Sequence, residues 1–265
     1  MIAGYEHFAG LASRLQWDEA AIDLRPDAGA WPGLDAPTRE RLLALLAGFC
    51  VGEASVADEL RPFADAADDP HAQACFLAQE GDERRHAAFF DRVMRDVCAV
   101  PGADAARRRD AARGLVPAGF LELFDERLPA VARDLGAGGT DLGRAVGLYH
   151  MVLEGVVFTA GQMAVLDLLE ERAELPGIRA GVELVLRDER WHVGFGTRCL
   201  DDAAPAPEAL EAVVREGTAA ARVWQDVVGE ALAAKVVAML HRRLSAVRPD
   251  VRQFIDDRQC KVAAN

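Results

Sequence analysis

The sequence predicts an all-α protein built from about eight helices with short connections. Three observations lead to this prediction. Alternating apolar and polar runs bounded by turn residues, which would mark strands, are nearly absent from the chain. Alanine, leucine, arginine and glutamate, which favour helices, dominate the composition. Several long apolar-periodic stretches also begin at a proline or directly after a short polar residue, as helices do.

The first half of the chain is predicted to hold an arm and four helical regions. Residues 1–35 contain several prolines and glycines and are expected to form an irregular arm. Pro37 stands in the first turn of the next helix, which runs to about residue 67, and Pro62 predicts a kink in it. The three helical regions that follow cover about 70–98, 103–113 and 117–135.

The second half begins with a turn from Gly136 to Thr140, and Thr140 is predicted as the N-cap of a helix that reaches about residue 173. Pro176 opens the next helix, which extends to about residue 202. Two more helices are expected at about 207–229 and 231–247. Because no shift of composition marks a boundary, residues 1–265 are predicted to form a single domain.

Composition and charge exclude several classes of protein. The chain has 265 residues, of which 51% are hydrophobic, so it can bury a large core and is not predicted to be disordered. Its formal net charge is -13. A surface of that sign repels phosphate backbones and anionic lipids, which argues against nucleic-acid binding and binding at a membrane surface.

The cysteines and the apolar runs indicate in which cellular compartment the protein is located and whether it spans a membrane. The five cysteines include no CxxC pair, and their odd number argues against a disulfide framework or a cysteine-based zinc site. With no secretory signal visible at the N-terminus, we expect a reducing, cytoplasmic location. The most apolar stretch, 145–169, is interrupted by His150, Glu154 and Asp167 and is therefore predicted to be a buried helix rather than a membrane span.

Four of the long predicted helices each carry a glutamate in an otherwise apolar run. In two of them, a histidine follows the glutamate three residues later. Residues spaced i and i+3 lie on one face of a helix, so each glutamate and its histidine can point at the same place. The six residues are Glu53, Glu83, His86, Glu154, Glu189 and His192.

This pattern predicts a di-metal site. A buried carboxylate without a partner is very costly, so it needs a cation, a proton or strong hydrogen bonds. Four carboxylates and two imidazoles suit two divalent ions of the iron or manganese type. Their order along the chain is that of a ferritin-like helical bundle with a four-helix di-metal core, here with about four additional helices. The alternative is a bundle whose glutamates pair with nearby arginines, namely Arg84, Arg85, Arg187 or Arg190.

Three further polar residues lie near these positions. His150 precedes Glu154 by four residues and is interpreted as a core histidine rather than a ligand. Glu80, one turn before Glu83, is expected to be solvated or to contact a metal-binding side chain without binding the metal itself. Asp188 either accepts the free N–H of a metal-bound histidine or is an exposed acid.

The spacing of the glutamates resembles that of the ribonucleotide reductase small-subunit (R2) superfamily. Glu83 follows Glu53 by 30 residues, Glu154 follows Glu83 by 68, and Glu189 follows Glu154 by 35. The segment RDERWH at 187–192 resembles the signature of the family's fourth core helix, and LQWDEAAIDL at 15–24 resembles its entry segment. The resemblance covers most of the chain, from about Trp17 to Asp202.

Within this superfamily the chain is most similar to the R2-like ligand-binding oxidases. Phe90 stands where radical-storing reductase subunits carry tyrosine. The resemblance implies a manganese–iron or di-iron site, O2 activation, a homodimer, and a long-chain fatty acid bound beside the metals. It also places Tyr149 at the position of a tyrosine that these oxidases cross-link to a valine. That valine's position holds Ser55, with Val56 next to it, so a cross-link is not expected. Tyr149 is then a hydrogen-bond or one-electron donor, or a packed core tyrosine.

The sequence therefore predicts an oxidase that uses two metal ions and O2 to oxidise an apolar, fatty-acid-like ligand. One alternative is a ribonucleotide reductase small subunit that lacks the radical tyrosine and works with a large partner. A second alternative is a metal-binding helical bundle without catalytic activity.

Overall fold

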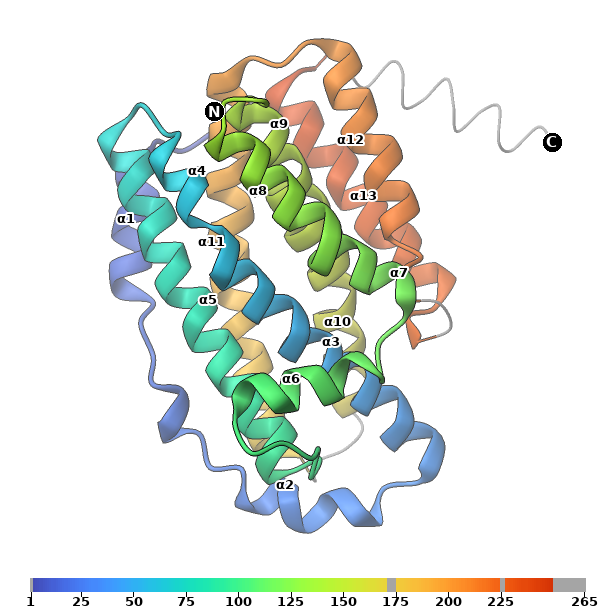
Figure 1. The fold of residues 1–265 in the computed structure, drawn as a ribbon. Helices are drawn as coiled ribbons and strands as arrows, with labels where there is room; N and C mark the ends of the chain where they lie inside the picture. The colour runs from blue at the N-terminus through green and yellow to red at the C-terminus, as the bar shows by residue number, and fades with distance from the viewer. Residues whose placement is uncertain (1, 171–174, 225–226, 250–265) are drawn as a thin grey trace, which may run out of the picture.

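The protein is described here by a computed structural model that covers residues 2–170, 175–224 and 227–249. Helices make up its regular structure, and these ranges contain no strand (Figure 1). The predicted all-α fold is therefore confirmed.

Four long helical segments form the core of the bundle. Three begin at an aspartate whose carboxylate accepts a hydrogen bond from a backbone N–H in the first turn: Asp35, Asp69 and Asp141. The fourth has Pro176 in its first turn. The segments are α3 (Ala36–Glu59), α5 (Pro70–Asp96), the continuous run of α9 (Leu142–Val146), η4 (Gly147–Phe158) and α10 (Thr159–Glu170), and α11 (Pro176–Ala203).

The other helices cover this core (Figure 1). α4 (Arg61–Asp65) packs on α5, and α6 (Ala105–Arg113) packs on α3. α7 (Ala118–Leu121) leads through η3 (Glu122–Arg127) into α8 (Leu128–Gly136), which also contacts α3. α12 (Pro207–Ala220) and α13 (Glu230–Val247) pack against η4.

The prediction of an irregular N-terminal arm is wrong. This region contains α1 (Tyr5–Arg14) and α2 (Arg25–Ala30), with the short turns η1 (Glu19–Ala21) and η2 (Trp31–Gly33). α1 lies against α5 and α11 and buries Phe8. Helices this short gain most of their stability from tertiary packing, so their own sequence carries little signal.

The structure also differs from the prediction at one N-cap and at one kink. Thr140 is not the N-cap of the apolar helix, because the side chain of Asp141 accepts the backbone N–H of Arg144 instead. The kink expected at Pro62 is a full break: α3 ends at Glu59, and α4 starts with Pro62 in its first turn.

The most apolar segment lies inside the bundle. Leu142–Glu170 is long and apolar enough to cross a membrane, but 78% of its most apolar window is buried within the protein. This burial is consistent with the predicted buried helix, and Glu154 within it is fully buried.

Candidate metal centre

The six predicted ligands come together between the four core segments. Glu53 comes from α3, Glu154 from η4, and the two Glu-x-x-His pairs from α5 and α11. All six are at most 1% exposed. Residues far apart in the chain therefore form one polar cluster in an apolar core.

The cluster divides into two groups that could each hold a metal ion. Glu53, Glu83, His86 and Glu189 form one group, and Glu83, Glu154 and His192 form the other; in each group the candidate ligand atoms lie within 4.8 Å of one another. Glu83 belongs to both groups. Its Oε2 lies 3.5 Å from His86 Nδ1, and its Oε1 lies 3.1 Å from His192 Nδ1.

Unpartnered polar atoms show that the cluster suits bound cations. Both carboxylate oxygens of Glu53 and of Glu189 are buried without a hydrogen-bond partner, as are one oxygen of Glu83, one of Glu154 and the Nδ1 atoms of both histidines. Leaving so many buried acceptors unsatisfied costs several kcal/mol each unless something else binds them. An oxygen-rich donor set with two imidazoles fits two ions of the iron or manganese type.

The alternative of glutamate–arginine pairing is not seen among the described ion pairs. Arg84 pairs with Glu80, 2.6 Å away on the outer face of α5. Arg85 pairs with Asp82 and Asp188, and Arg187 also pairs with Asp188. No described ion pair joins Arg84, Arg85, Arg187 or Arg190 to any of the four predicted ligand glutamates. Glu80, paired with Arg84, points away from the cluster.

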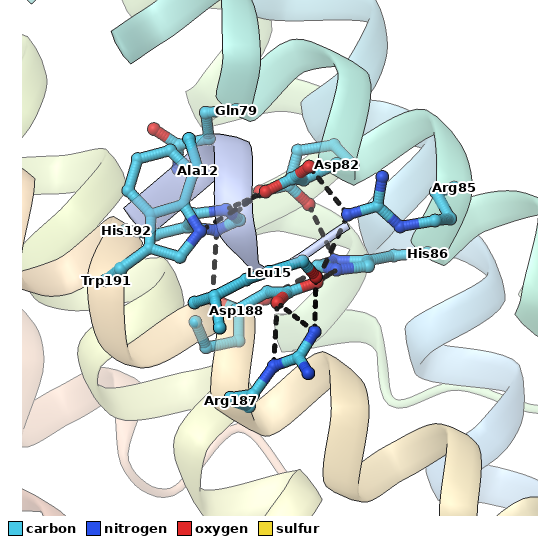
Figure 2. Close-up of polar contacts among 12 residues, drawn as sticks. Ala12, Leu15, Gln79, Asp82, Arg85, His86, Arg187, Asp188, Trp191 and His192 are labelled. Carbon is cyan, nitrogen blue, oxygen red and sulfur yellow. Dashed lines mark hydrogen bonds and ion pairs between the residues drawn. The ribbon is translucent and has the colours of Figure 1, made fainter. Parts of the chain in front are cut away.

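Each histidine is held by an aspartate from the opposite helix (Figure 2). His86 Nε2 on α5 lies 3.3 Å from Asp188 Oδ2 on α11, and His192 Nε2 on α11 lies 3.4 Å from Asp82 Oδ2 on α5. Such carboxylates orient an imidazole and leave its other nitrogen, here Nδ1, facing the centre. Arg85 contacts both aspartates and links the two pairs.

Two tryptophans complete these contacts. Trp17 donates its indole N–H to Asp188 at 2.7 Å, and Trp191 donates to Asp82 at 3.2 Å. Asp188, left open between two roles by the sequence, is fully buried against His86. Burial is the largest single effect and acts to raise its pKa, but the hydrogen bond and charge of His86, with the Trp17 hydrogen bond and the charge of His192, together lower the pKa to about 2.

Sequence reasoning missed Asp82. The signal was present, because residues 82–86 read DERRH and residues 188–192 read DERWH. The aspartate before each ligand glutamate is part of this repeat. The sequence could not show that the aspartate of one repeat serves the histidine of the other, since that depends on how α5 and α11 face each other.

A π-helix shapes the third core segment. Residues 147–158 form η4, where a plain α-helix was expected. Five residues separate Tyr149 from Glu154, and on an α-helix they would point about 140° apart. In the i→i+5 register of a π-helix the two side chains share a face. Both contact Gln79 Nε2 at 2.7 Å, which confirms that they point the same way.

The same π-helix carries His150. This histidine lies outside both ligand groups, and its Nε2 is 3.1 Å from Gln79 Oε1. At the end of η4, Thr159 donates to the Glu154 carbonyl, and Arg243 of α13 donates to the Gly155 carbonyl. These side chains satisfy carbonyl groups at the return to α-helix.

Buried charge sets the electrostatics of the metal-free centre. Burial, followed by repulsion from neighbouring carboxylates, raises the pKa of Glu53, Glu154 and Glu189. At Glu83 burial also acts upward, but the two imidazoles hold the pKa well below its ordinary value. The pKa values of the two ligand histidines are raised by the surrounding carboxylates despite burial.

The three remaining predicted positions lie in different surroundings. Tyr149 is fully buried and donates to Glu83 Oε1 at 3.1 Å. Phe90 is buried and stacks on Phe49, with ring centroids 4.9 Å apart. Ser55 donates its hydroxyl to the Phe124 carbonyl.

A pocket of about 330 Å³ opens between α10, α11 and α13 and reaches Glu189. The core at Gly161 on α10 is closely packed, because an added Cβ there would meet Phe49 and Trp224 at 2.8 Å. The pocket is lined by Thr159, Met163, Leu166, Asp167, Leu186, Glu189, Arg190, Val193, Lys235, Met239 and Arg243.

Comparison with known proteins gives two findings. Residues 7–221 match the model of the family "Ribonucleotide reductase, small chain". Among solved structures, a tyrosine-to-phenylalanine variant of an R2-like ligand-binding oxidase with an aerobically reconstituted Mn/Fe cofactor is similar to this chain, with a TM-score of 0.73 at 21% identity over 91% of this chain and 92% of that chain. A valine-to-isoleucine variant with an anaerobically reconstituted Mn/Fe cofactor gives a TM-score of 0.77 at 19% identity over 94% and 93%. At this identity the likeness concerns the fold.

The first prediction concerns metal content. We expect purified protein to hold up to two redox metals per chain, measured by elemental analysis. Glu53→Ala, Glu154→Ala and His192→Ala should each lower it, because each removes a donor atom from the cluster. Glu80→Ala is the control and should keep full content. A triple Glu53, Glu154 and His192 variant that retains all its metal would show the assignment to be wrong.

The second prediction concerns stability and pH. A glutamate whose pKa is raised by folding stabilises the folded state at pH values below its unfolded-state pKa of about 4.3. This stabilisation is lost as the pH rises through the folded-state pKa. The ligand histidines act in the same direction above about pH 6.5, whereas Glu83 acts oppositely. Bound metal offsets the loss, so thermal unfolding should separate metal-loaded from metal-free protein more at pH 7 than at pH 5. Equal melting temperatures at pH 7 would contradict a buried four-carboxylate site.

The third prediction is that no cross-link joins Tyr149 to α3. The Ser55 hydroxyl donates a hydrogen bond to the Phe124 carbonyl. Serine also lacks the tertiary carbon through which a valine side chain would form the cross-link. After metal loading in air, peptide mass spectrometry should find Tyr149 unmodified. A loss of two hydrogens mapped to linked peptides with Tyr149 and either Ser55 or Val56 would refute this.

Proposed function

Because the chain belongs to the ribonucleotide reductase small-chain family, we propose that it is a di-metal oxidase. It holds manganese and iron, or two irons, and activates O2 to oxidise an apolar ligand. The observation that carries this proposal is the centre itself, in which buried carboxylate oxygens without partners converge beside a pocket that reaches Glu189. The similar solved oxidases carry a Mn/Fe cofactor, which supports the choice of metals.

The alternatives receive less support. Phe90 packs among other phenylalanines, which argues against a subunit that stores its radical on a tyrosine at this position but fits the alternative of a reductase subunit without that tyrosine. A non-catalytic bundle would not require a pocket that opens onto a ligand. The pocket is within the size range of small-molecule sites.

The roles of the protein side chains follow from their contacts. When bound, the two metal ions supply the electrons for O2 reduction and the oxidising power for the substrate. Asp188 and Asp82 fix the imidazole rings so that their Nδ1 atoms face the centre. The apolar core around the cluster excludes water, which protects a reactive centre from side reactions. Tyr149 holds a phenol proton against Glu83.

The pocket lining indicates the class of ligand. Met163, Leu166 and Met239 give it apolar walls. Three basic side chains, Arg190, Lys235 and Arg243, outnumber the two carboxylates of the lining, Asp167 and Glu189. An amphiphile with an acidic end, such as a long-chain fatty acid, satisfies both features, since its chain buries apolar surface and its carboxylate pairs with a cation.

We also propose a homodimer in a reducing, cytoplasmic compartment. The four cysteines within the described ranges are free, which supports the compartment; Cys260 lies outside the described residues. The homodimer rests on the family resemblance.

The test blocks the pocket without touching the metal cluster. Met239→Trp adds bulk to the wall formed by α13, so it should abolish fatty-acid-dependent O2 uptake while metal content and the absorption spectrum of protein purified in air stay unchanged. Met239→Leu is the size-matched control and should keep activity. Unchanged O2 uptake in Met239→Trp would remove the pocket from the proposal, and nucleotide reduction with an added large subunit would favour the reductase alternative.

A further inference from the structure

A chain of buried polar groups leads from His150 to the metal cluster. His150 Nε2 lies 3.1 Å from Gln79 Oε1, and Gln79 Nε2 lies 2.7 Å from both Tyr149 Oη and Glu154 Oε1. Tyr149 Oη in turn lies 3.1 Å from Glu83 Oε1. All five side chains are fully buried. His150 and Gln79 are outside the candidate ligand groups, so the proposed metal binding does not account for them.

The hydrogen atoms in this chain have one consistent arrangement. When Glu154 is ionised, as a metal ligand is, its oxygens can only accept, so the Gln79 group that faces them is the amide N–H and the amide oxygen faces His150. An amide oxygen can only accept, so His150 carries its hydrogen on Nε2. The opposite tautomer would place an N–H on Nδ1, which is buried without a partner.

The surroundings of His150 keep its ring neutral and hold it in place. Burial lowers its pKa well below the ordinary value, so the ring is neutral and has a single N–H to give. The ring packs edge-on against Phe76 and Phe195. The backbone of α11 abuts it at Gly196, where an added Cβ would collide with the imidazole. The ring is therefore fixed in position as well as in protonation.

The orientation of the Gln79 amide determines the hydrogen bonds of Tyr149. Its oxygen accepts an N–H from Gln79, and the acceptor left for its own hydrogen is Glu83 Oε1. We propose that His150 and Gln79 are positioning residues that fix the Tyr149 phenol proton toward Glu83. The inference rests on the proposed function only for the role of Glu83 as the ligand common to both metals. If the Gln79 amide were turned over, the phenol would donate to it instead, and Glu83 would lose its hydrogen bond.

The sequence provides a direct spectroscopic test. The chain has two tyrosines, so Tyr5→Phe leaves Tyr149 as the only one. The tyrosine Fermi doublet in ultraviolet resonance Raman spectra changes its intensity ratio according to whether the phenol donates or accepts. Spectra are taken from metal-free protein and from protein loaded with Mn(II) without air, in the Tyr5→Phe background.

Three variants test the chain of contacts. Gln79→Leu removes the N–H that Tyr149 accepts and should shift the doublet toward a phenol that only donates. His150→Phe keeps a ring but removes the N–H, so Glu154 is the one remaining contact of the two that orient the Gln79 amide, and the doublet should change toward a mixture of states. His150→Gln replaces the N–H with an amide donor and should return the doublet toward that of the parent.

A packing control separates positioning from general disturbance. Phe120→Leu removes a buried ring that packs on Phe124 and Trp224 rather than on His150, and it should leave the doublet unchanged. The inference is overturned if His150→Phe and Gln79→Leu both keep the parent spectrum, or if Phe120→Leu shifts it as much as they do. Metal content is measured on the same samples. Failure to bind metal would contradict the proposed function, whereas the doublet of metal-free protein tests the positioning independently.

Discussion

The structure depends on the burial of four glutamates at one point between four helices. Each ionised carboxylate taken out of water costs several kcal/mol unless it is paired, and the described arginines pair elsewhere. The charge therefore has to be balanced by protons, as the raised pKa values of Glu53 and Glu154 indicate for metal-free protein, or by cations from outside the chain. The cluster nevertheless lies among buried apolar side chains of the four core segments.

The residues around the cluster serve its geometry. Asp82 and Asp188 cross between α5 and α11, and Arg85 ties them together, so the two histidines are oriented by a single linked network (Figure 2). The π-helix η4 brings Tyr149 and Glu154 onto one face. These features agree with a centre that must hold its donor atoms in place before any ion is bound.

The helices around the core leave a pocket through which a ligand could approach the cluster. α1 covers α5 and α11 on one side, while α10, α11 and α13 leave a pocket that reaches Glu189 on the other. Arg243 connects these roles, since it lines the pocket and also donates to the Gly155 carbonyl beside Glu154. A ligand in the pocket would therefore lie next to the segment that carries a metal ligand.

The sequence alone predicted the all-α fold, the helices of the core and the convergence of six ligand residues, because helical periodicity and the i, i+3 spacing are local properties. It did not predict α1, whose stability comes from packing on α5 and α11. It missed the pairing of Asp82 with His192 and the roles of Gln79 and His150, because these contacts join residues 70 or more positions apart. The π register of η4 was not predicted either; at its end Arg243 of α13, 88 residues away, donates to the Gly155 carbonyl, a contact that the local sequence does not show.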